Sequence, residues 1–315
     1  MVNERINIIL ITGFLGSGKT ILLNRLIEKY NSVKLGMIIN DFGKIAVDGI
    51  LFRNVLDKQT TSDESSIYEI KNGSIFCSCL SAELVKALKE YIEIKPEILI
   101  IETSGLSDPS VFRKILEENQ IADHFNLLTS VCLIDPYNVL KLASKIAAIE
   151  KQIVSSDIHV VNKIDMVDKD LIKDVNELIL NLKPSAKIIE TTFSKFDLAI
   201  LENVYQSYAD KEAVSCNTVN NRPGSLILRS KNVSIENLQN FYKVVSDKIL
   251  RLKGFMKIDG KYFYVSGNND ILNIEEYKDK PKGGRGLSVL LSSDNIDYVL
   301  NEWQKIAETT QVFSA

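Results

Sequence analysis

Histidine is scarce in this sequence. Only two histidines occur among 315 residues, so a metal site would have to draw its ligands from cysteines and carboxylates. Cysteine is sparse as well, because the whole chain has four. Four thiols in a chain of this length do not suggest a disulfide framework, and we expect a reducing, cytoplasmic environment.

Long apolar runs and a strong excess of one charge are also lacking. No run approaches the roughly 18 apolar residues of a membrane-spanning helix. The apolar run 6–11 is short and has no basic segment before it, so we expect no signal peptide. The net charge of −3 provides no basic field that would gather nucleic acid or an anionic membrane. We therefore expect a protein that binds neither.

The composition is otherwise that of a globular protein, with 45% hydrophobic and 25% charged residues. The length predicts about two domains. In the first two thirds of the chain, apolar runs of strand length alternate with helical patterns. We expect strands at 6–11, 34–39, 97–102, 127–134, 157–161 and 186–190. We expect helices at 19–30, 81–93, 109–118, 137–148, 168–182 and 196–207.

The expected strands are nearly continuous in isoleucine, valine and leucine, which is typical of a parallel sheet covered on both faces. The pattern therefore predicts an α/β domain with a doubly wound, mostly parallel sheet and ligands at the carboxyl ends of its strands. We assign this domain to residues 1–207. Residues 208–222 are polar and read as a linker between domains.

The pattern changes in residues 223–315. Antiparallel strands are expected at 225–230, 252–258, 261–266 and 286–292, with helices at 234–249 and 294–308. Asp259-Gly260 is a hairpin turn signal between two of these strands. The mixture predicts a smaller α+β domain.

A glycine-rich stretch, GFLGSGKT at residues 13–20, joins the first strand to the first helix. Glycines allow a tight turn in which successive backbone N–H groups point into one hollow, and the following helix adds the positive end of its dipole. A lysine here reaches the β- and γ-phosphates and a threonine hydroxyl ligates Mg²⁺. The alternative is a glycine-rich turn that merely caps the helix, but such a turn would not require the lysine and threonine as well as the glycines. The predicted nucleotide-binding residues are Gly13, Gly16, Ser17, Gly18, Lys19 and Thr20.

The buried run 98–102 ends in Glu102, and Gly105 follows shortly after. A carboxylate at the end of a parallel strand can hold the Mg²⁺ or orient the attacking water, and the Gly105 N–H can meet the γ-phosphate. We therefore assign Lys19 and Glu102 to catalysis and Thr20 and Glu102 to Mg²⁺. The alternative for Glu102 is an acid that caps the next helix. Asp135, which precedes Pro136, is more simply a helix N-cap.

Asn162, Lys163 and Asp165 follow another expected strand, in the order Asn-Lys-x-Asp. The Asp165 carboxylate can accept hydrogen bonds from both N1–H and the 2-amino group of guanine. Adenine offers no such pair of donors and would leave the carboxylate unpaired, at a cost of about 1–3 kcal/mol or more. The motif therefore indicates GTP, with the Lys163 stem over the base. Thr191-Thr192 stands where a backbone contact to guanine is expected, and His159 is expected to be a sheet residue.

Two further segments admit two interpretations each. Residues 40–66 form a long, polar connection at the expected nucleotide edge, which is either a switch region or a solvated insertion. Cys77 and Cys79 have the spacing at which two thiols reach one metal ion. The alternative is two small cysteines buried as apolar residues.

Taken together, these residues resemble the CobW family of P-loop GTPases, along the first domain and into the C-terminal part. The resemblance implies a metallochaperone-like GTPase that delivers or inserts metals such as zinc or cobalt. The family includes proteins tied to cobalamin biosynthesis and nitrile hydratase activation. The stretches that carry it are residues 13–20, Asn40-Asp41-Phe42-Gly43 with Asp48, Asn72-Gly73, residues 102–109 and residues 162–165.

The chain departs from the family pattern at two places. Asp41 replaces the glutamate of the family's N-E-F-G loop, and Lys44 stands where an acid is frequent. The family's C-x-C-C motif also lacks at least one thiol. Aligned on Asn72-Gly73, its cysteine positions hold Ser74, Phe76 and Cys77; aligned on the thiols, they hold Cys77, Cys79 and Leu80.

The resemblance leaves Cys77 and Cys79 as candidate ligands for Zn²⁺ or Co²⁺, with Asp41, Asp48 or a partner completing the shell. We expect a GTPase that uses Mg²⁺, and its intrinsic turnover should be slow because no arginine finger is identifiable. Its nucleotide state would control metal delivery or maturation of a client metalloprotein recognised by the C-terminal domain. The alternative is an assembly factor for a corrinoid or metalloenzyme partner that binds no metal itself.

Overall fold

The computed structural model describes most of the chain. The described residues are 5–41, 66–71, 75–76, 81–143, 146–202, 224–230, 233–268, 271–278, 280–281, 285–291 and 293–307. They fall into two compact units, the first with the elements from β1 to η4 and the second with those from β8 to α9. The assigned boundaries at 207, 208 and 222 lie outside the described residues and stay predictions.

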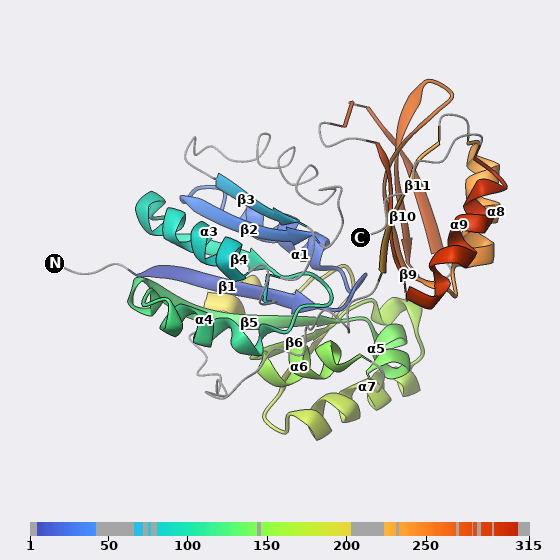
Figure 1. Cartoon of the computed structure of the whole chain (residues 1–315). Helices are drawn as coiled ribbons and strands as arrows, with labels where there is room; N and C mark the ends of the chain where they lie inside the picture. The colour runs from blue at the N-terminus through green and yellow to red at the C-terminus, as the bar shows by residue number, and fades with distance from the viewer. Residues whose placement is uncertain are drawn as a thin grey trace. The chain divides into compact units, whose positions relative to one another are not determined.

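The first unit is built on a seven-stranded sheet in the order β3-β2-β4-β1-β5-β6-β7 (Figure 1). All its neighbouring strands pair in parallel. The expectation of a doubly wound parallel sheet is confirmed. The strands are β1 (Ile6–Gly13), β2 (Leu35–Asp41), β3 (Ser66–Lys71), β4 (Ile98–Glu102), β5 (Phe125–Ile134), β6 (Ile158–Val161) and β7 (Lys187–Glu190).

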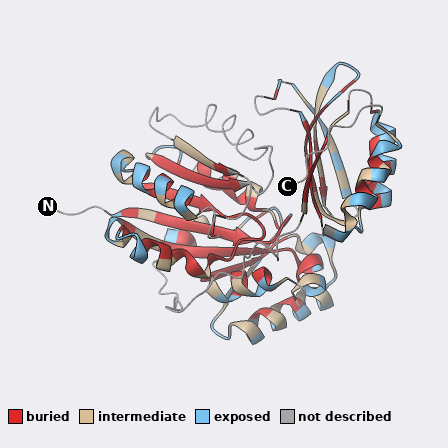
Figure 2. Cartoon of the chain, viewed as in Figure 1, coloured by how far each residue is buried: buried red, intermediate tan, exposed pale blue. Residues whose placement is uncertain are grey.

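Side chains of the central strand alternate between two apolar layers. Ile8 and Leu10 pack with α3 (Ser81–Ile94) and α4 (Phe112–Glu118). Ile9 and Ile11 pack on the other face with α1 (Lys19–Lys29). Because both faces are covered, inner strands such as β1, β4 and β6 are buried almost throughout, whereas the edge strands β3 and β7 are partly exposed. The helices keep exposed outer faces (Figure 2). Burial on both faces explains why the inner strands appear in the sequence as continuous apolar runs.

Three local expectations for this unit were wrong. One helix was expected at 137–148, but the chain forms α5 (Pro136–Leu142) and α6 (Ala147–Ser155). In the helix expected at 196–207, the described residues 196–202 contain the short 3₁₀ segment η4 (Leu198–Glu202), and residues 203–207 lie outside the described residues. β3 was missed, because it reads SIYEIK and lacks a continuous apolar run. The other elements of this unit are η1 (Pro109–Val111), η2 (Ala122–His124), η3 (Ile164–Met166) and α7 (Lys169–Leu182).

The second unit is a five-stranded antiparallel sheet in the order β11-β10-β9-β12-β8. Two helices pack on one face of it, and Trp303 is fully buried there against Phe241. The elements are β8 (Gly224–Leu228), α8 (Ile235–Val245), β9 (Ile249–Ile258), β10 (Lys261–Asn268), β11 (Ile271–Tyr277), β12 (Gly286–Leu291), η6 (Ser293–Asn295) and α9 (Ile296–Gln304). The predicted α+β class is confirmed.

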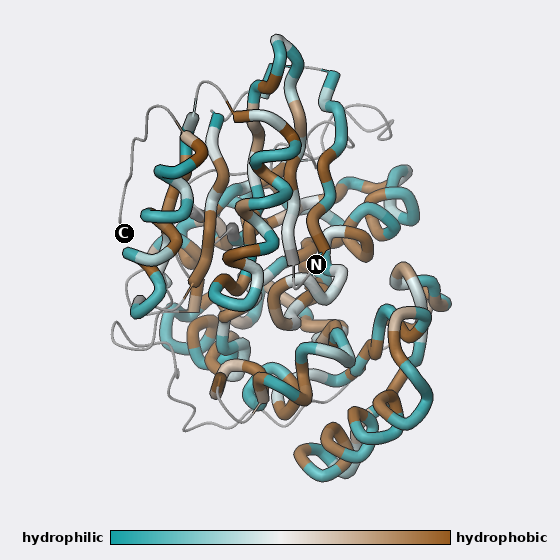
Figure 3. Tube along the Cα trace, turned by 90° about the vertical axis from the view of Figure 1, so that its right-hand side faces the viewer, coloured by the Kyte–Doolittle hydropathy of each residue, from teal (hydrophilic) through white to brown (hydrophobic). Residues whose placement is uncertain are grey.

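The hairpin expected at Asp259-Gly260 joins β9 to β10, and both turn residues have positive φ. β11 was not expected from the sequence. Hydrophobic and hydrophilic segments alternate along the helices, as their one-sided packing requires (Figure 3). Within the described parts of the chain, no helix has the length and apolar character needed to cross a membrane.

Candidate functional site: the carboxyl edge of the parallel sheet

The glycine-rich loop leaves the end of β1 and leads into α1. Gly18 stands at the N-cap with φ 108°, and no side chain caps the helix. The first N–H groups of α1 therefore face the loop, as a phosphate site requires. The Lys19 ammonium is buried and donates to the carbonyls of Gly13 (2.8 Å) and Phe14 (3.1 Å). The Ser17 hydroxyl is also buried, with no hydrogen-bond partner among the described residues.

These observations fit a nucleoside triphosphate. The loop offers an uncapped helix terminus, a buried ammonium and a buried hydroxyl, all groups that phosphate oxygens accept from. Thr20, the first-turn hydroxyl next to Lys19, is half-buried. The predicted phosphate residues thus share one loop.

Asn162, at the end of β6, binds this loop to the opposite side of the site. Its Nδ2 donates to the Ser17 carbonyl (2.9 Å), and its Oδ1 accepts from the Ser194 N–H (2.9 Å). A Cβ on Gly18 would lie 2.3 Å from Asn162 Nδ2, so this close approach requires glycine. One buried amide therefore fixes the spacing between the phosphate loop and the loop that follows β7.

The loop after β7 is held at several further points. The Thr191 N–H donates to the Val161 carbonyl (2.9 Å), and the Thr191 hydroxyl donates to the Lys195 carbonyl (2.5 Å). Arg25 of α1 donates to the Ser194 carbonyl. Phe193 and Ser194 both have positive φ, a conformation that persists only when its surroundings determine it. This loop is the expected place of the backbone contact to guanine.

The Asn-Lys-x-Asp motif turns away from the sheet at Lys163, whose φ is 62°. The Lys163 ammonium pairs with the Asp135 carboxylate at 2.9 Å. Asp135 also caps α5, with Pro136 next to it, as expected. Asp165 is exposed in the first turn of the same 3₁₀ segment. An accessible carboxylate here can accept hydrogen bonds from a nucleobase.

Glu102 ends β4 and is buried, opposite Ile11 of β1 in the sheet register. The next residue, Thr103, donates its N–H to the Ile11 carbonyl (2.9 Å) and its hydroxyl to Thr12 (3.1 Å). Glu102 is therefore placed next to the strand that carries the phosphate loop. The carboxylate and the phosphate loop lie at adjacent strand ends, which fits the predicted role with Mg²⁺.

Gly105 lies directly against the phosphate loop. A Cβ there would be 2.5 Å from the Leu15 side chain and 2.6 Å from the Leu15 N. On the other side, Gln152 of α6 donates to the carbonyls of Gly105 (3.3 Å) and Ser107 (2.9 Å). Gln152 carried no sequence signal, because it reaches this loop from far along the chain.

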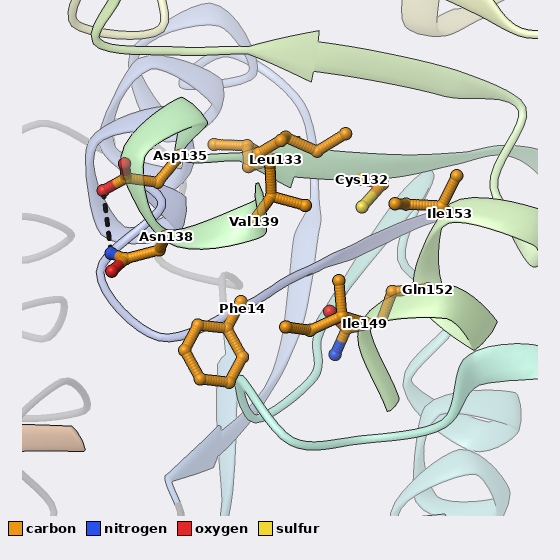
Figure 4. Close-up of a pocket in the computed structure, with 10 residues that line it drawn as sticks. Phe14, Cys132, Leu133, Asp135, Asn138, Val139, Ile149, Gln152 and Ile153 are labelled. Atoms are coloured by element: carbon orange, nitrogen blue, oxygen red, sulfur yellow. Dashed lines mark hydrogen bonds between the residues drawn. The ribbon is translucent and has the colours of Figure 1, made fainter. Parts of the chain in front are cut away.

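A small cavity of about 10 Å³ lies under the phosphate loop (Figure 4). Phe14, Ile149 and Cys132 line it together with Asp135, Asn138 and Gln152, but the surface that faces the cavity is almost wholly apolar, so a single water would find few partners. Burial raises the pKa of Cys132 to about 12, although the nearby Lys19 charge opposes the shift. Cys132 is thus a neutral packing residue and offers no thiolate to a metal.

The predicted metal ligands fall outside this geometry. Cys77, Cys79 and Asp48 lie outside the described residues, and for Asp41 only the backbone at the end of β2 is described. Within the parts of the chain that the structure describes, no group of three or more His, Cys, Asp or Glu residues could hold a metal ion. The metal assignment stays a prediction.

Asn40 lies near the site and holds neighbouring loops, through contacts that the sequence did not indicate. It is buried at the end of β2, and its Oδ1 accepts from the N–H groups of Ile75 (3.0 Å) and Ser104 (3.2 Å). Its Nδ2 donates to the Ile70 carbonyl (3.2 Å). In the sequence Asn40 appears only within the Asn40-Asp41-Phe42-Gly43 stretch of the family resemblance. Its partners lie in β3 and in the loops after β3 and β4, far from it in the chain.

Comparison with known protein families matches residues 7–190 to the nucleotide-binding domain of the CobW/HypB/UreG family. The chain belongs to this family. The match covers more than half of the chain and every strand of the parallel sheet, and it confirms the resemblance seen in the sequence.

Two curated relatives illustrate the likeness. The zinc-regulated GTPase metalloprotein activator 1 of Dictyostelium discoideum is 27% identical over 231 residues, 64% of this chain and 48% of the relative. The zinc chaperone YjiA of Escherichia coli is 25% identical over 280 residues, 81% of this chain and 83% of YjiA. The chain thus spans about half the length of the first relative. A solved structure of Zn(II)-bound YjiA GTPase from E. coli is 17% identical, with a TM-score of 0.47, covering 96% of this chain and 99% of that one.

Proposed function

We propose that this CobW-family protein is a GTP-binding switch that hydrolyses GTP slowly and couples its nucleotide state to metal delivery. Zinc or cobalt is the cargo, delivered to a client metalloprotein or to a cobalamin-related maturation step. The observation that carries the nucleotide assignment is the double hydrogen bond of Asn162, which joins Ser17 of the phosphate loop to Ser194 beside the base-reading motif. Two relatives support the proposal by their names, a zinc-regulated GTPase metalloprotein activator and a zinc chaperone.

The chain's own groups divide the work as follows. The Lys19 ammonium neutralises phosphate charge, and the uncapped start of α1 donates backbone N–H groups. Thr20 and Glu102 would hold Mg²⁺, which would neutralise phosphate charge. Asp165 reads the guanine edge. With no arginine finger identified in the sequence, we expect slow turnover.

Nucleotide binding is tested by titrating fluorescent GTP and ATP analogues into the full chain. We expect GTP to bind and ATP to bind far more weakly. Lys19→Ala should lose at least about 100-fold in GTP affinity, because a desolvated charged contact is removed. Lys29→Ala, at the other end of α1, is the control and should bind GTP as the wild type does. Unchanged GTP affinity in Lys19→Ala would refute the assignment.

The cargo is tested separately. With GTP present, the wild type should bind Zn²⁺ or Co²⁺ stoichiometrically, and Cys77→Ser/Cys79→Ser should lose that metal. Cys216→Ser makes the same chemical change outside the motif and should keep it. Asp41 and Asp48 complete the proposed shell, so Asp48→Asn should weaken binding.

The second candidate is a GTP-dependent assembly factor for a corrinoid or metalloenzyme partner, without metal of its own. The missing third thiol favours it, since two thiols do not complete a tetrahedral site. GTP hydrolysis with equal metal content in the wild type and the double cysteine variant would support this candidate. In either case we place client recognition on the C-terminal unit and the protein in the cytoplasm.

A further inference from the structure

We propose that Asn40 is a positioning residue that couples the loop after β4 to the segment entering Cys77. The inference rests on the proposed function, since it concerns how the nucleotide state reaches that segment. Asn40 lies on β2, between β3 and β4 in the sheet order, at the carboxyl edge. It thus stands between the strands whose following loops it binds.

One oxygen of Asn40 serves both loops. Its Oδ1 accepts from Ser104, next to Gly105, and from Ile75, two residues before Cys77. Both N–H groups belong to buried residues, so a displacement of one loop leaves a buried donor without its acceptor or moves Asn40 with it. A buried donor left unsatisfied costs about 1–3 kcal/mol. Movement of the two loops is therefore linked through this atom.

A second contact joins the same two segments. Phe76 is buried and packs edge-on against Phe112, with ring centroids 5.9 Å apart. Phe112 begins α4, the helix that follows the loop after β4. The pair Ile75–Phe76 is thus tied to both ends of the connection between β4 and α4. Only residues 77–80 separate this pair from α3, which begins at Ser81.

The loop after β4 is also the part of the site that nucleotide would move. Gly105 lies against Leu15 of the phosphate loop, and its N–H is the expected contact of the γ-phosphate. A change at Gly105 reaches Ser104 directly along the backbone. Asn40 then transmits the displacement of Ser104 to Ile75. An asparagine with a purely structural role would instead stabilise both loops equally in every nucleotide state.

The test compares thiol alkylation of Cys77 and Cys79 in GDP and in a non-hydrolysable GTP analogue, each with Mg²⁺ and no added transition metal. Rates are read by peptide mass spectrometry on the full chain. In the wild type we expect the two states to differ by at least about five-fold, the lower end of ordinary coupling between sites. Asn40→Ala should bring the ratio to about one while guanine-nucleotide affinity stays within about three-fold, because Asn40 binds the loops and not the ligand.

Asn40→Asp keeps acceptor oxygens for Ile75 and Ser104 and should preserve the ratio. Asn126→Ala is the matched control, since Asn126 binds Asn7 near the amino ends of β5 and β1 (2.9 Å), and it should behave as the wild type does. A wild-type ratio of one with both nucleotides bound overturns the inference, as does a preserved ratio in Asn40→Ala. Absence of guanine-nucleotide binding in the wild type overturns the proposed function itself.

If Asn40→Ala does not fold, hydrogen exchange in the wild type decides. Peptides containing the Ile75 and Ser104 amides should change their exchange together when GDP is replaced by the GTP analogue. A change confined to the Ser104 peptide overturns the inference.

Discussion

Two buried asparagines occupy matching positions at the carboxyl edge of the parallel sheet, Asn162 after β6 and Asn40 at the end of β2. Each accepts backbone N–H groups through Oδ1 and donates through Nδ2 to a carbonyl of another segment. Asn162 joins the phosphate loop to the loop after β7. Asn40 joins the loops that follow β3 and β4.

The difference lies in what each asparagine holds. The segments bound by Asn162 flank the expected triphosphate and guanine positions, so its loss should change nucleotide affinity. The segments bound by Asn40 lie after the strands on the other side of β1, so its loss should change what the protein does with bound nucleotide. We therefore propose that the same type of side chain serves ligand binding in one place and coupling in the other.

The largest expected effect is on Asn162. Asn162→Ala leaves the Ser17 carbonyl and the Ser194 N–H without this partner, and two unsatisfied buried groups cost about 1–3 kcal/mol each. We expect GTP affinity to fall by about 100-fold, measured by titration of a fluorescent GTP analogue. Asn40→Ala is the comparison variant and should bind within about three-fold of the wild type. Equal losses in the two variants would remove the distinction between them.

Gly105→Ala should affect both regions of this comparison, the phosphate loop held by Asn162 and the loop after β4 held by Asn40. Its methyl group would overlap the Leu15 backbone, and overpacking of this kind costs about 1–3 kcal/mol. We expect lower thermal stability and a reduced hydrolysis rate even at saturating GTP. Gly260→Ala tests a glycine with open space around it but positive φ, and should lower stability without changing hydrolysis. Unaltered hydrolysis in Gly105→Ala would argue against a role of this loop in sensing phosphate.

A buried histidine of β6, His159, should make the stability of the protein depend on pH in the acid range. Burial lowers the pKa of His159 to about 4, although its hydrogen bond to the Ile153 carbonyl opposes the shift. Its contribution to stability is therefore complete above about pH 6.5 and is lost as the pH falls toward 4. Burial also raises the pKa of the neighbouring Asp157, which works in the opposite direction. We expect a net loss of about 1 kcal/mol between pH 7 and 5.

Chemical denaturation at several pH values measures this loss. His159→Gln, which does not titrate, should flatten the dependence between pH 7 and 5. His124→Gln changes the other histidine of the chain, which is exposed, and should leave the dependence as in the wild type. An equal slope in His159→Gln and the wild type would exclude His159 as its source.

The smallest effect is expected at Arg25, which supports the loop after β7 from α1 by donating to the Ser194 carbonyl. Arg25→Ala removes one half-buried hydrogen bond, worth about 1 kcal/mol, so GTP affinity should fall by less than about ten-fold. Arg5→Ala, which removes an exposed pair with Asp123, should have no effect on binding. A loss of GTP affinity in Arg25→Ala as large as in Asn162→Ala would mean that support of the loop after β7, rather than the bridge made by Asn162, determines the affinity.

The sequence predicted the interior of the fold better than its edges. Buried strands such as β1 and β4 appear as unbroken apolar runs. β3 and β11, which were missed, are edge strands of their sheets and contain polar residues such as Glu69 and Glu275. Helices α5 and α6 were taken as one because apolar spacing continues across their boundary.

The same limit applies to the site. Asn162 was recognised because Lys163 and Asp165 follow it in a fixed spacing. Asn40 and Gln152 act through backbone groups far away in the chain, and no local pattern records such contacts. Asp135 was correctly assigned as a cap, but its ion pair with Lys163 emerges only in the folded chain.

Base recognition by Asp165 tests the account most directly. Xanthine carries a carbonyl where guanine has its 2-amino group, so an asparagine amide can donate where the aspartate accepts. Binding of GTP and xanthosine triphosphate should be titrated in the wild type and in Asp165→Asn. We predict that the wild type prefers GTP and that Asp165→Asn reverses the preference, with at least a 10-fold change of about 1.4 kcal/mol or more. An unchanged preference for GTP in Asp165→Asn would contradict the assignment of this sheet edge to guanine.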